Sequence, residues 1–337
     1  MNTYLFNRCI QDDSIFHKSL DNCETVFLYE RPCWESGMDS RSKKCFFDFP
    51  KTRKLELVYR FKESKVGGVL EEGFEYYLAD AGSLTGGVNF DDTSKIKDFV
   101  EILHGVSKKL IIDITSMNIR LISALISNLV YNDDWDGIYI CYSEPKAYKM
   151  ERDDFDEQFL LNNKCFDASE LPGLETTEDY FMNDYLWYVF LGFEGGRYSK
   201  LENDVSPQHG YEVPIISIPP MKAVWHNYAV KSNLKQINSY SQVEKIKYVS
   251  ATNPFEVYNF LTKEKNRIGE KKLLISPLGT KPIALGVIMY LLEHMEDKSL
   301  TDCPVQTASN SDAPEITHYY DLTYYINSRR NMRFVDM

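Results

Sequence analysis

Two short polar turns hold the residues best suited to bind a ligand. Hydroxyl, amide and backbone N–H groups donate hydrogen bonds there, and a basic side chain in each turn adds positive charge, so both turns suit an anion such as a phosphate. Ordinary helix capping uses the same small polar residues but requires no lysine. These residues are Thr115, Ser116, Asn118 and Arg120 in the first turn and Gly279, Thr280 and Lys281 in the second.

Each turn joins an apolar run to a helical pattern. Residues 109–114 and 272–277 predict buried strands, and each is followed by an apolar helical pattern. In a parallel α/β sheet, ligands bind beyond the carboxyl ends of the strands, where helix N-termini gather. We expect Thr115 or Ser116 to cap the first helix, and Pro282 to occupy a first-turn position where its missing N–H costs nothing.

A second pair of strand ends offers further candidates. In the C-terminal half, the segment 192–204 places two adjacent glycines between Glu194 and Arg197. Arg197 could contact a ligand or pair with one of the many carboxylates. The corresponding place in the N-terminal half holds Arg31, Trp34 and Ser36. Neither GxGxxG nor GxxxxGK[ST] occurs here, which argues against a dinucleotide fingerprint and a P-loop.

The elements that position these turns alternate between strand and helix patterns. This alternation predicts an α/β fold of two tandem Rossmann-like parallel-sheet halves. Predicted strands cover 25–30, 55–61, 75–80, 109–114, 137–143, 187–193, 213–218, 246–251, 272–277 and 304–308. Predicted helices cover 93–106, 118–130, 221–238 and 254–264, and the glycine-rich segment 80–90 is interpreted as a loop.

An internal duplication is suggested by equal spacings. Val26 and Val189 begin similar runs 163 positions apart (189 − 26), and Lys109 and Lys272 are also 163 apart (272 − 109). Any doubly wound fold repeats such units, so chance is the alternative. The predicted organisation is an N-terminal half at 1–150, an acidic linker at 151–184, a C-terminal half at 185–308 and an extension at 309–337. We expect this extension to pack on the second half or on another subunit.

The composition narrows the class of protein. A net charge of −12 argues against an extended nucleic-acid surface, although a local nucleotide pocket remains compatible with it. The chain has no run long enough to cross a membrane and no signal-peptide pattern, so we expect a cytoplasmic protein without membrane contact. Seven cysteines without CxxC predict neither a metal site nor a disulfide framework, and no cofactor is expected.

Motifs of known catalysts are absent from the sequence. HExxH, GxSxG and DFG do not occur, so the catalytic residues of any activity are unknown. Glu144 and Tyr148 follow a predicted strand, and Trp225, His226 and Asn227 follow another. A histidine beside a tryptophan is more often packed than catalytic.

The strand that ends in Asp113-Ile114-Thr115-Ser116 and enters a helix, with a second half of similar plan, resembles the CARF domain and the related SAVED domain. The resemblance rests on residues 113–120 and 279–281, and the first turn lacks the glycine usual in that family. It implies a Rossmann-like sensor of a nucleotide second messenger, such as a cyclic oligoadenylate, in prokaryotic antiviral defence. Because no effector nuclease motif is present, it also implies a partner protein or effector subunit.

Three hypotheses follow. The first is a nucleotide-sensing or regulatory subunit that binds a nucleotide or cyclic oligonucleotide near 115–120 and 279–281. The second is a metal-independent enzyme of phosphodiesterase or N-glycosidase type. In that enzyme Ser116 or Thr280 would orient the substrate, Lys281 or Arg197 would stabilise charge, and Glu144 or Glu194 would act as base. The third is a structural subunit of a larger complex.

Overall fold

A computed structural model describes the chain in two compact units. Residues 8–147 with 306–337 form the N-terminal unit, and residues 148–305 form the main part of the C-terminal unit. The described residues are 9–11, 18–31, 41–66, 69–80, 83–88, 93–132, 134–147, 151–152, 157–158, 164–175, 185–205, 212–239, 246–305 and 314–333. Both units are mixed α/β structures, which confirms the predicted fold class.

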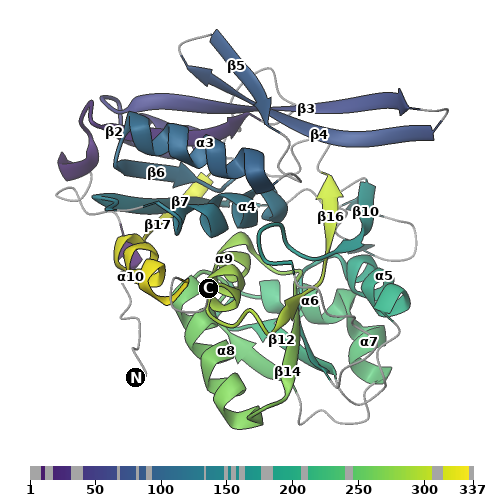
Figure 1. Ribbon diagram of the computed structural model, residues 1–337. Coiled ribbons are helices and arrows are strands. Elements are labelled where there is room, and N and C mark those ends of the chain that lie inside the picture. Colours follow the sequence, from purple (N-terminus) through teal and green to yellow (C-terminus); the bar gives the residue numbers. More distant parts are fainter. Residues whose placement is uncertain are drawn as a thin grey trace. The chain divides into compact units, whose positions relative to one another are not determined.

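The N-terminal unit is built on an eight-stranded sheet of order β1-β17-β7-β6-β2-β3-β4-β5 (Figure 1). Neighbours among β3, β2, β6 and β7 are parallel, and the flanking strands are antiparallel. Residues 110–112 of the central strand β6 are at most 1% exposed, which explains their unbroken apolar run. The strands are β1 (Cys9–Gln11), β2 (Thr25–Arg31), β3 (Arg53–Val66), β4 (Val69–Asp80), β5 (Ser83–Val88), β6 (Lys109–Asp113), β7 (Gly137–Pro145) and β17 (Pro314–Asp321).

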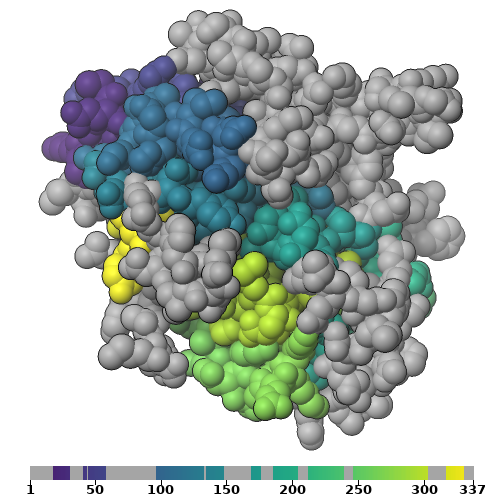
Figure 2. Space-filling view, viewed as in Figure 1, coloured from purple at the N-terminus to yellow at the C-terminus, as the bar shows by residue number. Residues whose placement is uncertain are grey.

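Helices cover this sheet. The helices α3 (Thr93–Val106) and α4 (Ile119–Leu129) lie beside one another over the strands, and their atoms form a continuous blue surface in Figure 2. The helix α2 (Ser42–Asp48) packs on the sheet face that carries Phe27 and Cys141. The helix α10 (Thr323–Arg333) follows β17.

The C-terminal unit has a five-stranded parallel sheet of order β13-β12-β11-β14-β15. The chain winds outward from β11 through β12 to β13, then returns to the other side of β11 with β14. This order reverses between β11 and β14, which is the place where doubly wound folds bind ligands. The strands are β11 (Tyr185–Phe190), β12 (Glu212–Ser217), β13 (Lys247–Val249), β14 (Lys272–Pro277) and β15 (Lys298–Ser299).

Five helices and two small sheets complete the described part of this unit. A Cβ added to Gly286 of α9 would lie 2.6 Å from Val257 Cβ of α8, so glycine lets these two helices pack closely. The helices are α5 (Gly195–Val205), α6 (Trp225–Ser232), α7 (Leu234–Ser239), α8 (Pro254–Ile268) and α9 (Lys281–Leu291). The small sheets pair β8 (Glu151–Arg152) with β9 (Glu157–Gln158), and β10 (Lys164–Ser169) with β16 (Thr301–Val305).

Several local predictions differ from the structure. The segment 80–90, interpreted as a loop, contains β5, which pairs with β4. The predicted linker 151–184 contains β10, whose pairing with β16 is long-range and leaves no local pattern. The predicted helix 221–238 is divided into α6 and α7 at Asn233, whose side-chain amide donates to the Ala229 carbonyl oxygen.

The C-terminal stretch lies elsewhere than expected. Residues 309–337 were predicted to pack on the second half or on another subunit. Instead, β17 pairs with β7 and β1 of the N-terminal unit. The phenolic hydroxyl of Tyr319 donates to Asp48 Oδ2 of α2 at 3.0 Å. Alternation in 316–320 is short and aromatic-rich, so the sequence alone does not select the sheet that this strand joins.

Sheet register tests the suggested duplication. In the N-terminal unit Leu110 pairs with Val26; its counterpart 163 positions on, Leu273 (273 − 110), pairs with Leu186. Val26 therefore corresponds to Leu186, at a spacing of 160 (186 − 26), and its match with Val189 is a coincidence. The placement of the strands does correspond, since β2 lies between β3 and β6 as β11 lies between β12 and β14.

Candidate functional site

The carboxyl edge of the C-terminal unit brings two predicted loops together. Because β11 and β14 are adjacent and parallel, the loop after Phe190 and the loop after Pro277 leave the sheet side by side. The predicted residues of this half therefore share one edge: Glu194 and Arg197 follow β11, and Gly279, Thr280 and Lys281 follow β14. This edge coincides with the reversal of strand order.

Glycine makes the close contact of these loops possible. A Cβ added to Gly192 would overlap the carbonyl oxygen of Leu278 and lie 3.1 Å from its carbonyl carbon. A Cβ added to Gly279 would lie 2.9 Å from Ile283 Cδ1 and 3.6 Å from the Leu191 carbonyl oxygen. The two backbones thus meet with no side chain between them, and the neighbouring main chain is what requires glycine here.

Thr280 begins α9 without capping it through its side chain. Its hydroxyl donates instead to the carbonyl oxygen of Ala251, in the loop between β13 and α8. By contrast, Asn253 caps α8 by accepting from the N–H groups of Phe255 and Glu256 at 3.1 and 3.3 Å. The first turn of α9 therefore combines the positive end of a helix dipole with the half-buried Lys281, a combination that favours an anion.

The Arg197 side chain forms an ion pair within the protein. Its Nε lies 3.0 and 2.9 Å from the two carboxylate oxygens of Asp302, its Nη2 lies 2.6 Å from Oδ1, and Glu194 is 3.9 Å away. The Asp302 side chain is fully buried. Of the two roles considered for Arg197, the carboxylate pair is the one observed. Arg197 and Glu194 thus shape the loop after β11 through a charge network of their own.

An aromatic pair lies in the same region of this unit. Phe193, which follows Gly192, contacts Trp225 edge-to-face at a centroid distance of 5.4 Å. Lys222 Nζ lies 5.5 Å from the Trp225 ring centroid. All three residues are half-buried, so their rings and charge are partly accessible. Trp225 was singled out from the sequence, but Phe193 was not. The only signal for Phe193 was its position directly after Gly192, where a predicted strand ends.

The first predicted turn lies at the corresponding edge of the N-terminal unit and is tightly hydrogen-bonded. Thr115 Oγ1 accepts from the Ser143 N–H at 3.0 Å, and Ser116 Oγ donates to the Glu30 carbonyl oxygen at 3.1 Å. The expected cap by Thr115 or Ser116 is wrong. Asn118 caps α4 instead, because its backbone is extended immediately before the helix. Its Oδ1 accepts a hydrogen bond from the Leu121 N–H at 2.8 Å.

This N-terminal edge is acidic as well as buried. Glu144 Oε1 lies 2.5 Å from His318 Nε2, and both residues are at most 5% exposed. Glu30 is also buried, while Arg120 on α4 is half-buried. No sequence pattern pointed to His318, which β17 brings beside β7. Trp34, Ser36, Tyr148 and the side chain of Arg31 lie outside what the structure describes.

The chain has no significant match among protein-family models, curated proteins or solved structures. None of the described helices has the length and apolar character needed to cross a membrane. The class defined by the observations is therefore a two-unit Rossmann-like α/β protein, with a mixed sheet in the N-terminal unit and a parallel sheet with a glycine-lined edge in the C-terminal unit.

Proposed function

We propose that this protein is a cytoplasmic nucleotide-sensing or regulatory subunit, and that it binds a nucleotide-like anion at the carboxyl edge of the C-terminal unit. The observation that carries this proposal is the direct contact of Gly192 with Leu278 where the strand order reverses. A position in prokaryotic antiviral defence, with a separate effector as partner, is supported by the resemblance to CARF and SAVED domains.

The chemistry of this edge fits the parts of a nucleotide. Backbone N–H groups at the start of α9 and the ammonium of Lys281 suit a phosphate. The Phe193–Trp225 pair offers an aromatic surface for a base, with Lys222 beside it. Arg197 serves as a support for the loop, because its guanidinium is engaged by Asp302.

The test is thermal unfolding of the purified protein against AMP, ATP and cyclic di-, tri- and tetra-adenylate. A ligand that binds the folded state raises the midpoint by mass action, by an amount equivalent to about 2.7 kcal/mol at 100 times Kd. We expect such a shift to be lost in Lys281→Ala. It should persist in Lys263→Ala, which removes an exposed lysine of α8 in the same unit.

Recovery of the ligand separates sensing from catalysis. A nucleotide recovered unchanged after incubation supports a sensor, whereas cleaved nucleotide would replace the proposal with the metal-independent enzyme. No shift with any of these nucleotides at millimolar concentration would leave the structural-subunit hypothesis.

A further inference from the structure

Three potential metal ligands meet beneath α2 in the N-terminal unit. The two sulfurs of Cys45 and Cys141 and a carboxylate oxygen of Asp113 all lie within 4.8 Å of one another. All three side chains are fully buried, and both cysteines are free thiols. They come from α2, β6 and β7, so their separation in sequence conceals the cluster.

Sheet register fixes two of these groups on one face. Asp113 and Cys141 are directly paired in the parallel β6–β7 ladder, so their side chains point to the same side of the sheet. Ser143, two residues beyond Cys141, shares that side, and its Oγ lies 3.5 Å from Cys45 Sγ. Asp113 Oδ1 accepts from the Thr115 N–H at 2.9 Å, which orients the carboxylate.

Cysteine binds a metal ion as the thiolate, so a cation in this cluster would displace the protons of both thiols. Lys54 is near enough for both thiols to act on its pKa. Once the metal has displaced both thiol protons, two thiolates, one carboxylate and the Lys54 ammonium carry a net charge of −2, which a divalent cation neutralises.

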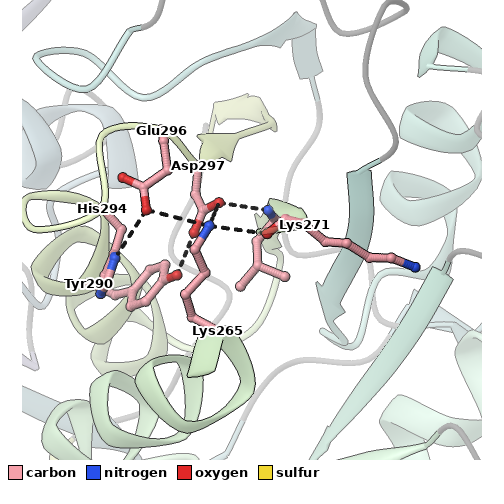
Figure 3. A network of polar contacts seen from close by, with 7 residues as sticks. Lys265, Lys271, Tyr290, His294, Glu296 and Asp297 are labelled. Atoms are coloured by element: carbon pink, nitrogen blue, oxygen red, sulfur yellow. Dashed lines mark hydrogen bonds and ion pairs between the residues drawn. The ribbon is translucent and has the colours of Figure 1, made fainter. Parts of the chain in front are cut away.

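A second cluster of potential metal ligands already has a lysine between its carboxylates. His294, Glu296 and Asp297 also bring donor atoms within 4.8 Å of one another. In Figure 3, however, the Lys265 ammonium lies between the carboxylates, 2.8 Å from Asp297 Oδ1 and 3.4 Å from Glu296 Oε1. Tyr290 donates to the other Asp297 oxygen, so a lysine and a phenol already occupy the space between these carboxylates, and this group carries no proposal.

The Lys54 ammonium makes its hydrogen bonds outside the cluster of Cys45, Asp113 and Cys141. It donates to the carbonyl oxygens of Phe46 and Phe49 and to Thr52 Oγ1, at 3.0, 2.7 and 2.8 Å. It therefore closes the C-terminal end of α2 and is committed to oxygen acceptors outside the sulfur–carboxylate cluster.

We propose that Cys45, Asp113 and Cys141 bind a thiophilic divalent cation, with Zn²⁺ the best fit, and that this centre attaches α2 to the sheet. Thiolates and carboxylates are both ligands that Zn²⁺ takes, and Ser143 Oγ lies beside the cluster, 3.5 Å from Cys45 Sγ. Zn–S bonds of about 2.3 Å separate tetrahedral ligands by less than 4 Å, so a small contraction of the cluster suffices. The absence of CxxC predicted no metal site, because ligands brought together by sheet register leave no such local spacing.

The test measures metal in the full chain purified without chelator. Inductively coupled plasma mass spectrometry should find equimolar zinc. Cobalt(II) added to the zinc-stripped, reduced protein should give thiolate-to-cobalt charge-transfer absorption. Cys45→Ser, Cys141→Ser and Asp113→Asn should each lose the zinc and weaken the cobalt band, whereas Cys23→Ser, at an exposed free cysteine of the same unit, should keep both.

Two results would overturn the proposal. One is wild-type protein that carries no zinc and gives no charge-transfer band with cobalt. The other is a Cys45–Cys141 disulfide found by non-reducing peptide mass analysis of protein purified in air. Because both readouts use the wild-type chain, misfolding of a variant cannot decide the outcome.

Discussion

Arg197 and Asp302 form an almost fully buried ion pair at the carboxyl edge of the C-terminal unit, with three N–O distances between 2.6 and 3.0 Å. The Arg197 side chain is only 12% exposed and that of Asp302 is fully buried. This pair joins the first turn of α5 to β16, so a residue predicted as a ligand contact has a structural task.

Arg197→Ala should destabilise the C-terminal unit by about 3–5 kcal/mol, because it leaves a buried carboxylate without its cation. Urea unfolding monitored by tryptophan fluorescence measures this loss. Arg267→Ala is the matched control: Glu264 keeps a hydrogen bond from Tyr188 and has Lys247 at 3.7 Å, so the loss should be about 1 kcal/mol. Equal losses in the two variants would contradict a special role for the Arg197–Asp302 pair.

The adjacent glycines at the start of α5 should respond in opposite ways. A Cβ at Gly195 would overlap the Ser232 carbonyl oxygen and lie 2.6 Å from its carbon, whereas a Cβ at Gly196 meets nothing within 4 Å. Gly195→Ala should therefore lower the free energy of unfolding by about 1–3 kcal/mol. Gly196→Ala should be neutral or stabilise by about 0.5 kcal/mol, since alanine is the better helix former. Thermal unfolding of both variants checks this, and equal midpoints would refute the close contact.

Tyr319→Phe tests the placement of β17 in the N-terminal unit. The variant loses the hydroxyl that donates to Asp48 at 3.0 Å and retains the ring that packs on Phe49. We expect a loss of about 1 kcal/mol, the usual net value of one hydrogen bond. Tyr324→Phe removes a hydroxyl from a side chain that is 67% exposed and should change little. If denaturant unfolding gives no difference between the two, the contact between β17 and α2 is absent.

Lys54 should make the free energy of unfolding of the N-terminal unit rise with pH in the alkaline range. Burial lowers its pKa from 10.5 to about 8. Between these values the unfolded chain holds the proton that the folded protein has lost, so stability rises with pH across this window. The destabilising contribution is complete below about pH 8 and fades toward 10.5.

The measurement compares wild type with Lys54→Met by urea unfolding at several values from about pH 7.5 to 10.5. The difference in unfolding free energy should shift in favour of wild type as pH rises. Lys51→Met, at a lysine whose side chain is 75% exposed, should show no such trend. Parallel pH profiles for wild type and Lys54→Met would exclude the lowered pKa.

The periodic segments of the fold were predictable from sequence. The helix expected over 93–106 is α3, and the strand expected over 272–277 is β14, because apolar periodicity reports burial directly. The turn chemistry was predicted less well. Asn118 rather than Thr115 or Ser116 caps α4, since capping depends on one backbone conformation that several polar neighbours could adopt.

The sequence by itself determined an acidic α/β chain with two strand-turn-helix segments of similar plan, since local apolar patterns and turn residues act over short separations. Only the tertiary structure decided which strands are neighbours. Strand pairing placed Gly192 against Leu278, brought His318 to Glu144, and gathered Cys45, Asp113 and Cys141 on one face. Such contacts depend on sheet register and loop closure over long separations, and a one-residue change of register would turn each side chain to the opposite face.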